Sequence, residues 1–292
     1  MILGIIGQGF VGTAINNGLK SHYEILTYDL DANKCNSTHG DVCKKSEIIL
    51  ICVPTPMRKD GSCDTRILES AIDDVYNTFK DSQRKEAPIL VIKSTVPPGT
   101  TDEIDAKYKD MKVLFSPEFL TEANSFEDFK NQNRIIVGVP NQDVDKVSPE
   151  GEKVVNMFSK VVKEETHIMI STAKEAEMCK YFINCFLATK VIFANQMYDI
   201  CKSAGLDYDV VKFLALLDPR IGKSHMMVPG PDGDRGFGGH CFPKDLSAMI
   251  KFGMDNNVPY SSSFLQEVEN YNKLVRNNRD WEKMKGRAVS DD

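Results

Sequence analysis

The chain has 292 residues, enough for about two domains that each bury a core. Lys and Arg total 36 against 42 Asp and Glu, and both signs are spread along the sequence with a formal net charge of −6. This balance argues against the clustered basic surface that nucleic-acid binding needs. No apolar run approaches the roughly 18 residues of a membrane span, and the apolar start lacks the basic region of a signal peptide. We therefore expect a soluble, globular protein that binds neither nucleic acid nor membrane.

Apolar strands alternate with amphipathic helices through the first half of the chain. The pattern predicts strands over residues 1–6, 24–29, 48–53, 88–95, 113–116, 134–139 and 167–170. It predicts helices over residues 11–20, 64–79, 100–109 and 150–162. Such alternation indicates βαβ units and an α/β fold with a doubly wound, mostly parallel sheet.

The second half carries helical patterns and no strand signal. Helices are predicted over residues 174–205, 207–217, 243–252 and 261–276, with a loop rich in Gly and Pro over 218–240. We expect the first domain over 1–171 and an all-helical domain with a long central helix over 172–292. The polar stretch 277–292 is expected to fray.

The eight cysteines do not form a disulfide or metal-binding pattern. None is part of a CxxC motif, and most lie in apolar or helical stretches. We expect a cytoplasmic protein with reduced thiols, most of them small buried hydrophobic residues, and no metal site.

A glycine-rich turn lies between the first predicted strand and the first predicted helix. It reads GxGxxG and consists of Gly7, Gln8, Gly9, Phe10, Val11 and Gly12. The strand–turn–helix context is the one in which this motif binds the pyrophosphate of a dinucleotide. Asp29 ends the second strand, where a carboxylate binds the adenosine ribose and disfavours a 2′-phosphate, so the pattern predicts a Rossmann-type NAD site. Lys34 is either an adenosine-phosphate contact or a solvated surface lysine.

Two further predicted strands end in polar segments at the edge where open α/β sheets bind ligands. Val53, Pro54 and Thr55 follow one strand, and Ser94 and Thr95 follow the next. Position alone leaves Thr95 equally suited to lining the cofactor cleft and to a local structural role.

Cys241 stands where a glycine-rich run meets a predicted helix, within GFGGHCFPKD over residues 236–245. A thiol at a helix start is more readily ionised, because it is near the positive end of the helix dipole. Asp245 is one helical turn away and could hold a water or accept a proton. These features favour a nucleophile over a buried structural cysteine, and the adjacent His240 is not expected to form a dyad with it.

Lys180 and Asn184 are four residues apart on one face of the long helix. An ammonium and an amide together can stabilise an oxyanion. Without Cys241, a lysine and an asparagine on a helix surface would be the simpler interpretation.

Several strings together resemble the nucleotide-sugar 6-dehydrogenase family, and most of all its UDP-glucose branch. They occur in the family's order over most of the chain: GQGFVG (7–12), CVPTPM (52–57), KSTVPPGT (93–100), SPEFLTEANS (116–125), CKYFINCFLA (179–188), DPRIG (218–222) and GFGGHCFPKD (236–245).

The resemblance implies an NAD-dependent, four-electron oxidation of UDP-glucose to UDP-glucuronate. Cys241 would capture the C6 aldehyde as a thiohemiacetal and then carry a thioester. Lys180 and Asn184 would stabilise the oxyanions, and Glu118 would help to activate water. Holding the aldehyde covalently keeps it in place while the cofactor is exchanged.

The resemblance also assigns binding roles. Asp245 and Thr95 would position the water that takes the first proton, and Glu122 and Lys244 would contact the cofactor. Contacts with the substrate would come from Glu118, Phe119, Leu120, Glu122, Lys180, Asn184, Phe237, Gly238 and, across a dimer interface, Arg220.

Members of the family normally continue into a third domain that binds the UDP moiety, and this chain stops shortly after the helix predicted over 261–276. A truncated chain, a partner that carries the missing part and a naturally short protein all remain open. The alternatives to UDP-glucose oxidation are oxidation of GDP-mannose or of UDP-N-acetylmannosamine, and a catalytically inert module that binds NAD or dimerises. The apolar long helix favours a homodimer formed through the helical domain.

Overall fold

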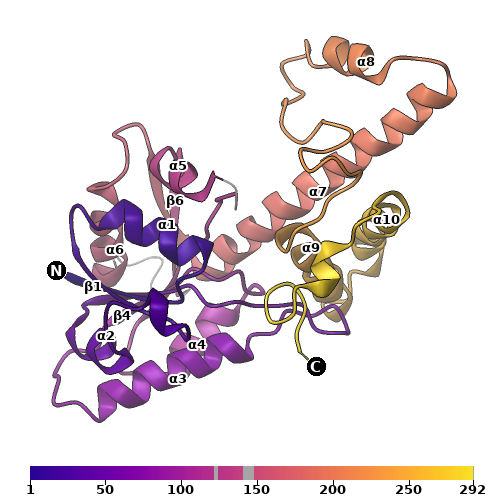
Figure 1. Ribbon diagram of the computed structural model, residues 1–292. Coiled ribbons are helices and arrows are strands. Elements are labelled where there is room, and N and C mark those ends of the chain that lie inside the picture. Colours follow the sequence, from indigo (N-terminus) through magenta and orange to yellow (C-terminus); the bar gives the residue numbers. More distant parts are fainter. Residues whose placement is uncertain (122–123, 141–147, 292) are drawn as a thin grey trace. The chain divides into compact units, whose positions relative to one another are not determined.

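The computed structural model describes residues 1–121, 124–140 and 148–291 (Figure 1). The chain divides into two compact units. The first comprises Met1–Thr55 and Thr65–Lys180, and the second comprises Pro56–Asp64 and Tyr181–Asp292. The domain boundary expected from the sequence lies between residues 171 and 172, whereas the first unit continues to Lys180 and residues 56–64 belong to the second.

The first unit is built on one sheet in the order β2-β1-β3-β4-β5-β6-β7. Its strands are β1 (Ile2–Ile6), β2 (Glu24–Tyr28), β3 (Ile48–Ile51), β4 (Ile89–Ile92), β5 (Val113–Phe115), β6 (Arg134–Val139) and β7 (His167–Thr172). All neighbouring strands pair in parallel except β5 and β6, which are antiparallel. The predicted strands and the doubly wound α/β class are confirmed.

Helices cover both faces of this sheet (Figure 1). One face packs against α1 (Phe10–Leu19), α5 (Ser125–Lys130) and α6 (Pro149–Ser159). The other packs against α2 (His39–Lys45), α3 (Arg66–Lys80) and α4 (Thr100–Lys107). The central strands β3 and β4 are buried throughout, so their apolar runs supply both cores. The short helices α2 and α5 and the 3-10 turn Ala32–Lys34 were not predicted.

The second unit is helical, as expected. Helix α7 (Ala173–Ser203) runs from the first unit into the second and is followed by Gly205, whose φ of +71° suits glycine. Then come α8 (Tyr208–Ala215), a long loop, α9 (Cys241–Asp255), α10 (Pro259–Val275) and the 3-10 helix η4 (Asp280–Lys283). Leu246 and Ile250 of α9 form the main core of this unit with residues of α7 and α10. Across the part of the chain that the structure describes, no helix has the length and apolar character needed to cross a bilayer.

The C-terminal segment is ordered through Asp291, so the prediction that it frays is wrong. Trp281 is only 5% exposed and Ala288 is fully buried. The backbone N–H of Met57 donates to the carbonyl of Ala288 at 2.8 Å, and Ser290 donates back to Met57 at 2.8 Å. A few buried apolar residues and these backbone hydrogen bonds therefore hold a segment whose overall composition is polar.

Candidate functional site

The glycine turn between β1 and α1 has the backbone geometry that a bound pyrophosphate needs. Gly7 has a φ of +93°, and a Cβ on Gly12 would lie 1.9 Å from the carbonyl oxygen of Gly7, so glycine is required at both positions. A Cβ on Gly9 would meet no atom within 4 Å, which leaves room for a ligand to approach the backbone. Helix α1 follows with no side-chain cap and no acidic residue in its first turn. The start of α1 therefore suits an anion, and the turn fits the phosphates of NAD.

Asp29 lies directly against this turn. Its carboxylate accepts hydrogen bonds from the backbone N–H of Gln8 at 2.6 Å and of Asp31 at 2.9 Å. The structure thus places this acid beside the turn, as the spacing predicts. Lys34 is half exposed and forms an ion pair with Asp31 at 3.7 Å, so its role at the adenosine phosphate stays a prediction.

The ends of β3 and β4 are joined by side-chain hydrogen bonds. The Thr55 hydroxyl donates to the carbonyl of Thr95 at 2.7 Å, and the Ser94 hydroxyl donates to the carbonyl of Val53 at 2.6 Å. Pro54 between them is exposed. The predicted cofactor residues after the two strands therefore form one connected segment at the carboxyl edge of the sheet.

Glu118 follows β5 and forms a buried ion pair with Lys93 at the end of β4. The two charged groups are 3.2 Å apart, and their side chains are 7% and 2% exposed. Lys93 also donates to the Ser116 hydroxyl at 3.1 Å, and Lys180 donates to the backbone carbonyl of Glu118 at 2.5 Å. Lys93 was not predicted as a site residue. A lysine directly after a buried apolar strand was the available signal, because a buried charge needs a partner.

The residues after Glu118 are only partly described. The Phe119 ring lies beneath two cations, with the Lys180 ammonium 5.3 Å and the Arg134 guanidinium 4.2 Å from its centroid. Leu120 packs against the core on one face of the sheet. Glu122, predicted to contact the cofactor and the substrate, lies outside the described residues.

In the second unit, Cys241 is the first residue of α9 and is half-buried. Lys244, one turn along, is buried and donates to the Asp245 carboxylate at 2.5 Å. Burial alone would lower the pKa of Lys244, but attraction to Asp245 and to the thiolate forms of Cys63 and Cys241 raises the pKa above its ordinary value. A buried cation close to the Cys241 thiol favours the thiolate in turn. No sequence pattern marked Cys63.

Asn184 is bound to the same acid. Its side-chain amide donates to Asp245 at 2.5 Å, so Asn184 and Lys244 together hold both carboxylate oxygens. Asp245 is 1% exposed. The structure thus brings three predicted residues of the second unit together and fixes the acid at the start of the helix that carries Cys241.

The other thiols differ from Cys241. None of the eight cysteines forms a disulfide, and burial raises the pKa of Cys43, Cys52 and Cys185 to about 12. Cys43, Cys185 and Cys201 are buried, whereas the other five cysteines are half-buried, so the prediction that most of the cysteines are buried core residues is wrong.

The remaining predicted substrate residues belong to the loop before α9. Phe237 is 5% exposed, and its backbone N–H and carbonyl both bind the side chain of Asn272. Gly238 is half-buried. Arg220 is different, because its side chain is 87% exposed and is held by Asp218 at 2.6 Å.

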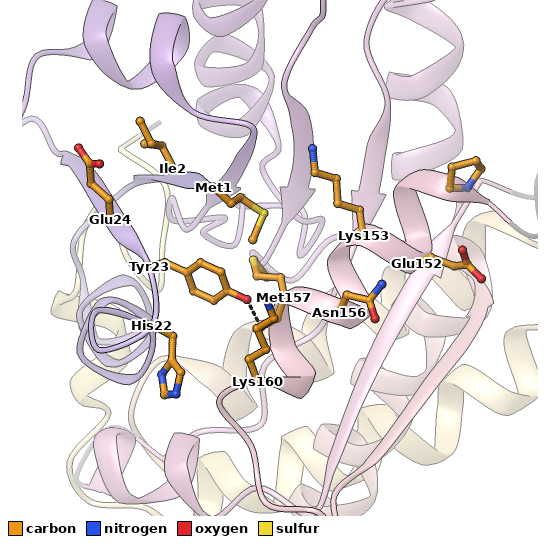
Figure 2. A pocket seen from close by; sticks show the side chains of 11 residues that line it. Met1, Ile2, His22, Tyr23, Glu24, Glu152, Lys153, Asn156, Met157 and Lys160 are labelled. Carbon is orange, nitrogen blue, oxygen red and sulfur yellow. Dashed lines mark hydrogen bonds between the residues drawn. The ribbon is translucent and has the colours of Figure 1, made fainter.

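A separate hollow of about 640 Å³ lies in the first unit near the amino ends of β1 and β2 (Figure 2). Tyr23 lines it and donates from its hydroxyl to the Met157 carbonyl at 3.1 Å, and Lys153 and Lys160 lie at its border. Open α/β sheets bind nucleotides at the carboxyl ends of their strands. This hollow is at the other edge and does not belong to the glycine turn.

Comparison with known proteins identifies the family. Residues 36–162 match the NAD binding domain of the UDP-glucose/GDP-mannose dehydrogenase family, and residues 174–274 match its central domain. The chain belongs to this family. The family's NAD-binding domain and the glycine turn together identify NAD as the cofactor.

UDP-glucose 6-dehydrogenase of Rickettsia felis is 34% identical to this chain over 233 residues. The matched region covers 77% of this chain and 48% of that protein. The structure of a UDP-glucose dehydrogenase from Pyrobaculum islandicum superposes with a TM-score of 0.79 at 27% identity, covering 92% of this chain and 68% of that one. The structure of a UDP-N-acetylmannosamine dehydrogenase from Pyrococcus horikoshii superposes with a TM-score of 0.77 at 21% identity. The match covers 94% of this chain and 69% of that one, and it shows that the two share a fold. The chain spans about half the length of the Rickettsia relatives that it matches.

Proposed function

We propose that the protein oxidises the C6 hydroxymethyl group of a UDP-hexose, in the first place UDP-glucose, to the carboxylate with NAD as the hydride acceptor. The observation that carries this proposal is the position of Cys241 at the start of α9, beside Lys244 and Asp245, in a member of this dehydrogenase family. Relatives that are about a third identical bear the name UDP-glucose 6-dehydrogenase.

In the first stage the C6 alcohol loses a hydride and a proton and becomes an aldehyde. NAD supplies the hydride acceptor when it is bound at the glycine turn. Asp245 takes the proton through a water that Thr95 helps to hold. The hydrogen bonds from Asn184 and Lys244 fix the Asp245 carboxylate for this task.

In the second stage the Cys241 sulfur adds to the aldehyde carbon and forms a thiohemiacetal. The Lys180 ammonium and the Asn184 amide stabilise the developing oxyanion. Loss of a second hydride leaves a thioester on Cys241. The covalent bond to Cys241 would keep the aldehyde in the site during exchange of the cofactor.

In the third stage water hydrolyses the thioester. Glu118 accepts a proton from the attacking water, and the ion pair with Lys93 holds its carboxylate in place. The C–S bond breaks, the thiol is restored, and the water oxygen stays in the new carboxylate. One water and two NAD therefore convert each alcohol to a carboxylate and yield two NADH and three protons.

We assign cofactor and substrate contacts as the family resemblance implies. Besides the glycine turn and Asp29, the proposed cofactor contacts are Lys34, Val53, Pro54, Thr55, Ser94, Thr95, Glu122 and Lys244. The proposed substrate contacts are Glu118, Phe119, Leu120, Glu122, Lys180, Asn184, Arg220, Phe237 and Gly238.

We also propose a homodimer formed through the helical unit. Large apolar side chains of α7 and α8 are more than half exposed, among them Phe182, Phe186, Phe193, Phe213 and Leu214. Large apolar side chains left exposed in this way favour an interface. Sedimentation at micromolar protein should give a dimer, and a monomer would contradict the assignment. Eight cysteines without a disulfide favour a reducing compartment such as the cytoplasm.

The activity is tested by incubating the protein with NAD and a panel of nucleotide sugars. We expect two NADH per UDP-glucose, and no turnover after Cys241→Ala. The matched control Cys179→Ala, a half-buried cysteine outside the proposed site, should keep activity. Faster oxidation of GDP-mannose or UDP-N-acetylmannosamine would replace UDP-glucose as the substrate. Calorimetry that detects NAD binding but no binding of any nucleotide sugar would contradict the proposal and indicate an inert module.

A further inference from the structure

The loop that leads to Cys241 needs to be held, because its glycines are conformationally free. Gly236 and Gly239 have φ angles of +65° and +69°, which glycine adopts more readily than other residues. Glycine loses more backbone entropy on ordering than any other residue. The position of the thiol therefore depends on contacts made to the loop by other parts of the second unit.

Asn272 of α10 holds the first part of this loop. Its side chain accepts from the Phe237 N–H at 2.8 Å and donates to the Phe237 carbonyl at 3.0 Å. A Cβ on Gly236 would lie 2.2 Å from the Asn272 side-chain oxygen, so glycine is needed for this close approach.

Asp280 of η4 holds the second part. The backbone N–H of Gly239 donates to both oxygens of the Asp280 carboxylate, each 3.1 Å from the nitrogen. Gly239 is two residues before Cys241. A Cβ on Gly238 would lie 2.6 Å from Asp280 and 2.3 Å from the guanidinium of Arg276. The glycine run thus passes directly over this acid and this arginine.

Arg276 connects the loop to the C-terminal segment. Its side chain is 3% exposed and lies 2.6 Å from Asp232, 3.6 Å from Asp234 and 3.8 Å from Asp280. It also donates to the Asn278 carbonyl at 2.8 Å. The guanidinium is thus a buried cation that three partly exposed carboxylates share, and without it these acids would face one another with no counter-charge.

We propose that Asp280 and Arg276 are positioning residues for Cys241, which fix the peptide N–H of Gly239 and thereby keep the thiol at the first turn of α9 beside Lys244. The inference rests on the proposed role of Cys241 as the nucleophile. Figure 1 shows the C-terminal segment, in yellow, beside α9 and α10. The segment that the sequence alone marks as a frayed end therefore acts on the reactive thiol.

The test is the pH dependence of alkylation of Cys241 by iodoacetamide, followed by mass spectrometry of its peptide. Only the thiolate reacts, so the profile reports how well the helix start and Lys244 stabilise that form. Lys244 interacts electrostatically with this thiol, and it interacts in the same way with Asp245 of α9 and with Cys63 of segment 56–64. The variants leave all three unchanged.

Asp280→Ala should move the profile to higher pH and slow alkylation at pH 7 by about three- to tenfold, because the loop no longer holds the thiol at the helix start. The control Glu282→Ala removes an acid of the same 3-10 helix that lies 3.6 Å from Arg279, and it should behave like the wild type. A profile for Asp280→Ala that coincides with the wild type overturns the proposal, even if the melting temperature falls.

Asp280→Asn decides the question if the alanine variant does not fold. It keeps an oxygen acceptor for Gly239 but loses the charge that faces Arg276, so a smaller slowing of about two- to threefold is expected. An unchanged profile in this variant also overturns the proposal. No substrate is needed, so failure of the proposed activity in the wild type is seen separately in the NADH assay.

Discussion

Glu177 is a buried acid whose titration should be visible in the pH dependence of stability. It lies on α7, is fully buried, and binds the start of α4. Its carboxylate accepts from the backbone N–H of Gly99 at 2.6 Å, and from the N–H and hydroxyl of Thr101 at 2.8 and 2.6 Å. Burial raises its pKa from 4.5 to about 7, although the three hydrogen bonds lower it. Desolvation therefore outweighs three donors at this site.

The sign of the effect follows from the raised pKa. Below pH 4.5 the acid is protonated in both the folded and the unfolded chain, and the folded chain has its full stability. Between pH 4.5 and about 7 only the unfolded chain ionises, so the free energy of unfolding falls as pH rises. At about 1.4 kcal/mol per pH unit, the loss from this one group is about 3 kcal/mol.

Urea unfolding of the wild type and of Glu177→Gln from pH 4 to pH 8 measures this loss. The difference between the two free energies should change by about 3 kcal/mol across the interval, because glutamine does not titrate there. Glu175→Gln is the matched control, since Glu175 is exposed two residues earlier on the same helix. Parallel stability curves for the wild type and Glu177→Gln would refute the reasoning.

The remaining predictions concern the glycine turn and the buried ion pair. Gly9→Val should weaken NAD binding at least about tenfold by calorimetry, because the valine side chain fills the open space beside the turn, while the melting temperature stays nearly unchanged. An unaltered affinity would contradict the assigned pyrophosphate site. Gly12→Ala should instead destabilise the fold by about 3 kcal/mol in urea, because its Cβ would lie 1.9 Å from the Gly7 carbonyl, and wild-type stability would show that the turn is wrongly built. Lys93→Met should lower the free energy of unfolding by about 3–5 kcal/mol in urea, because it leaves the Glu118 carboxylate without its cation. Adding Glu118→Gln should recover part of this loss, and strictly additive losses would argue against the ion pair.

Most of the fold could be predicted because the hydrophobic pattern is strong where the sheet is formed. The four apolar residues of β3 and of β4 are fully or almost fully buried, and their neighbours in the sheet follow from the alternation of strands and helices. Short elements were not predicted from the hydrophobic pattern because they bury few residues. Helix α5 buries only Phe129, which is too little for a periodic signal. The order of the C-terminal segment was not predicted because the segment is held by single buried residues such as Trp281.

The candidate site was predictable where one local motif carries the chemistry. The glycine turn with Asp29, and Cys241 at the start of a helix, each follow from short strings with a physical requirement. Lys93 and Asp280 act through residues distant in the sequence, and their partners become evident only when the fold brings them into contact. Glu122 lies outside the described residues, so its assignment rests on the family resemblance alone.

The most direct test of the account is to search for the thioester itself. The protein is mixed with UDP-glucose and NAD, quenched in acid within a few turnovers and digested, and the peptide that contains Cys241 is weighed. Glu118→Gln should slow hydrolysis and increase the adduct. We predict a peptide heavier by one UDP-glucuronyl group, and none in Cys241→Ala. Full production of NADH with an unmodified Cys241 peptide in both the wild type and Glu118→Gln would contradict the covalent mechanism.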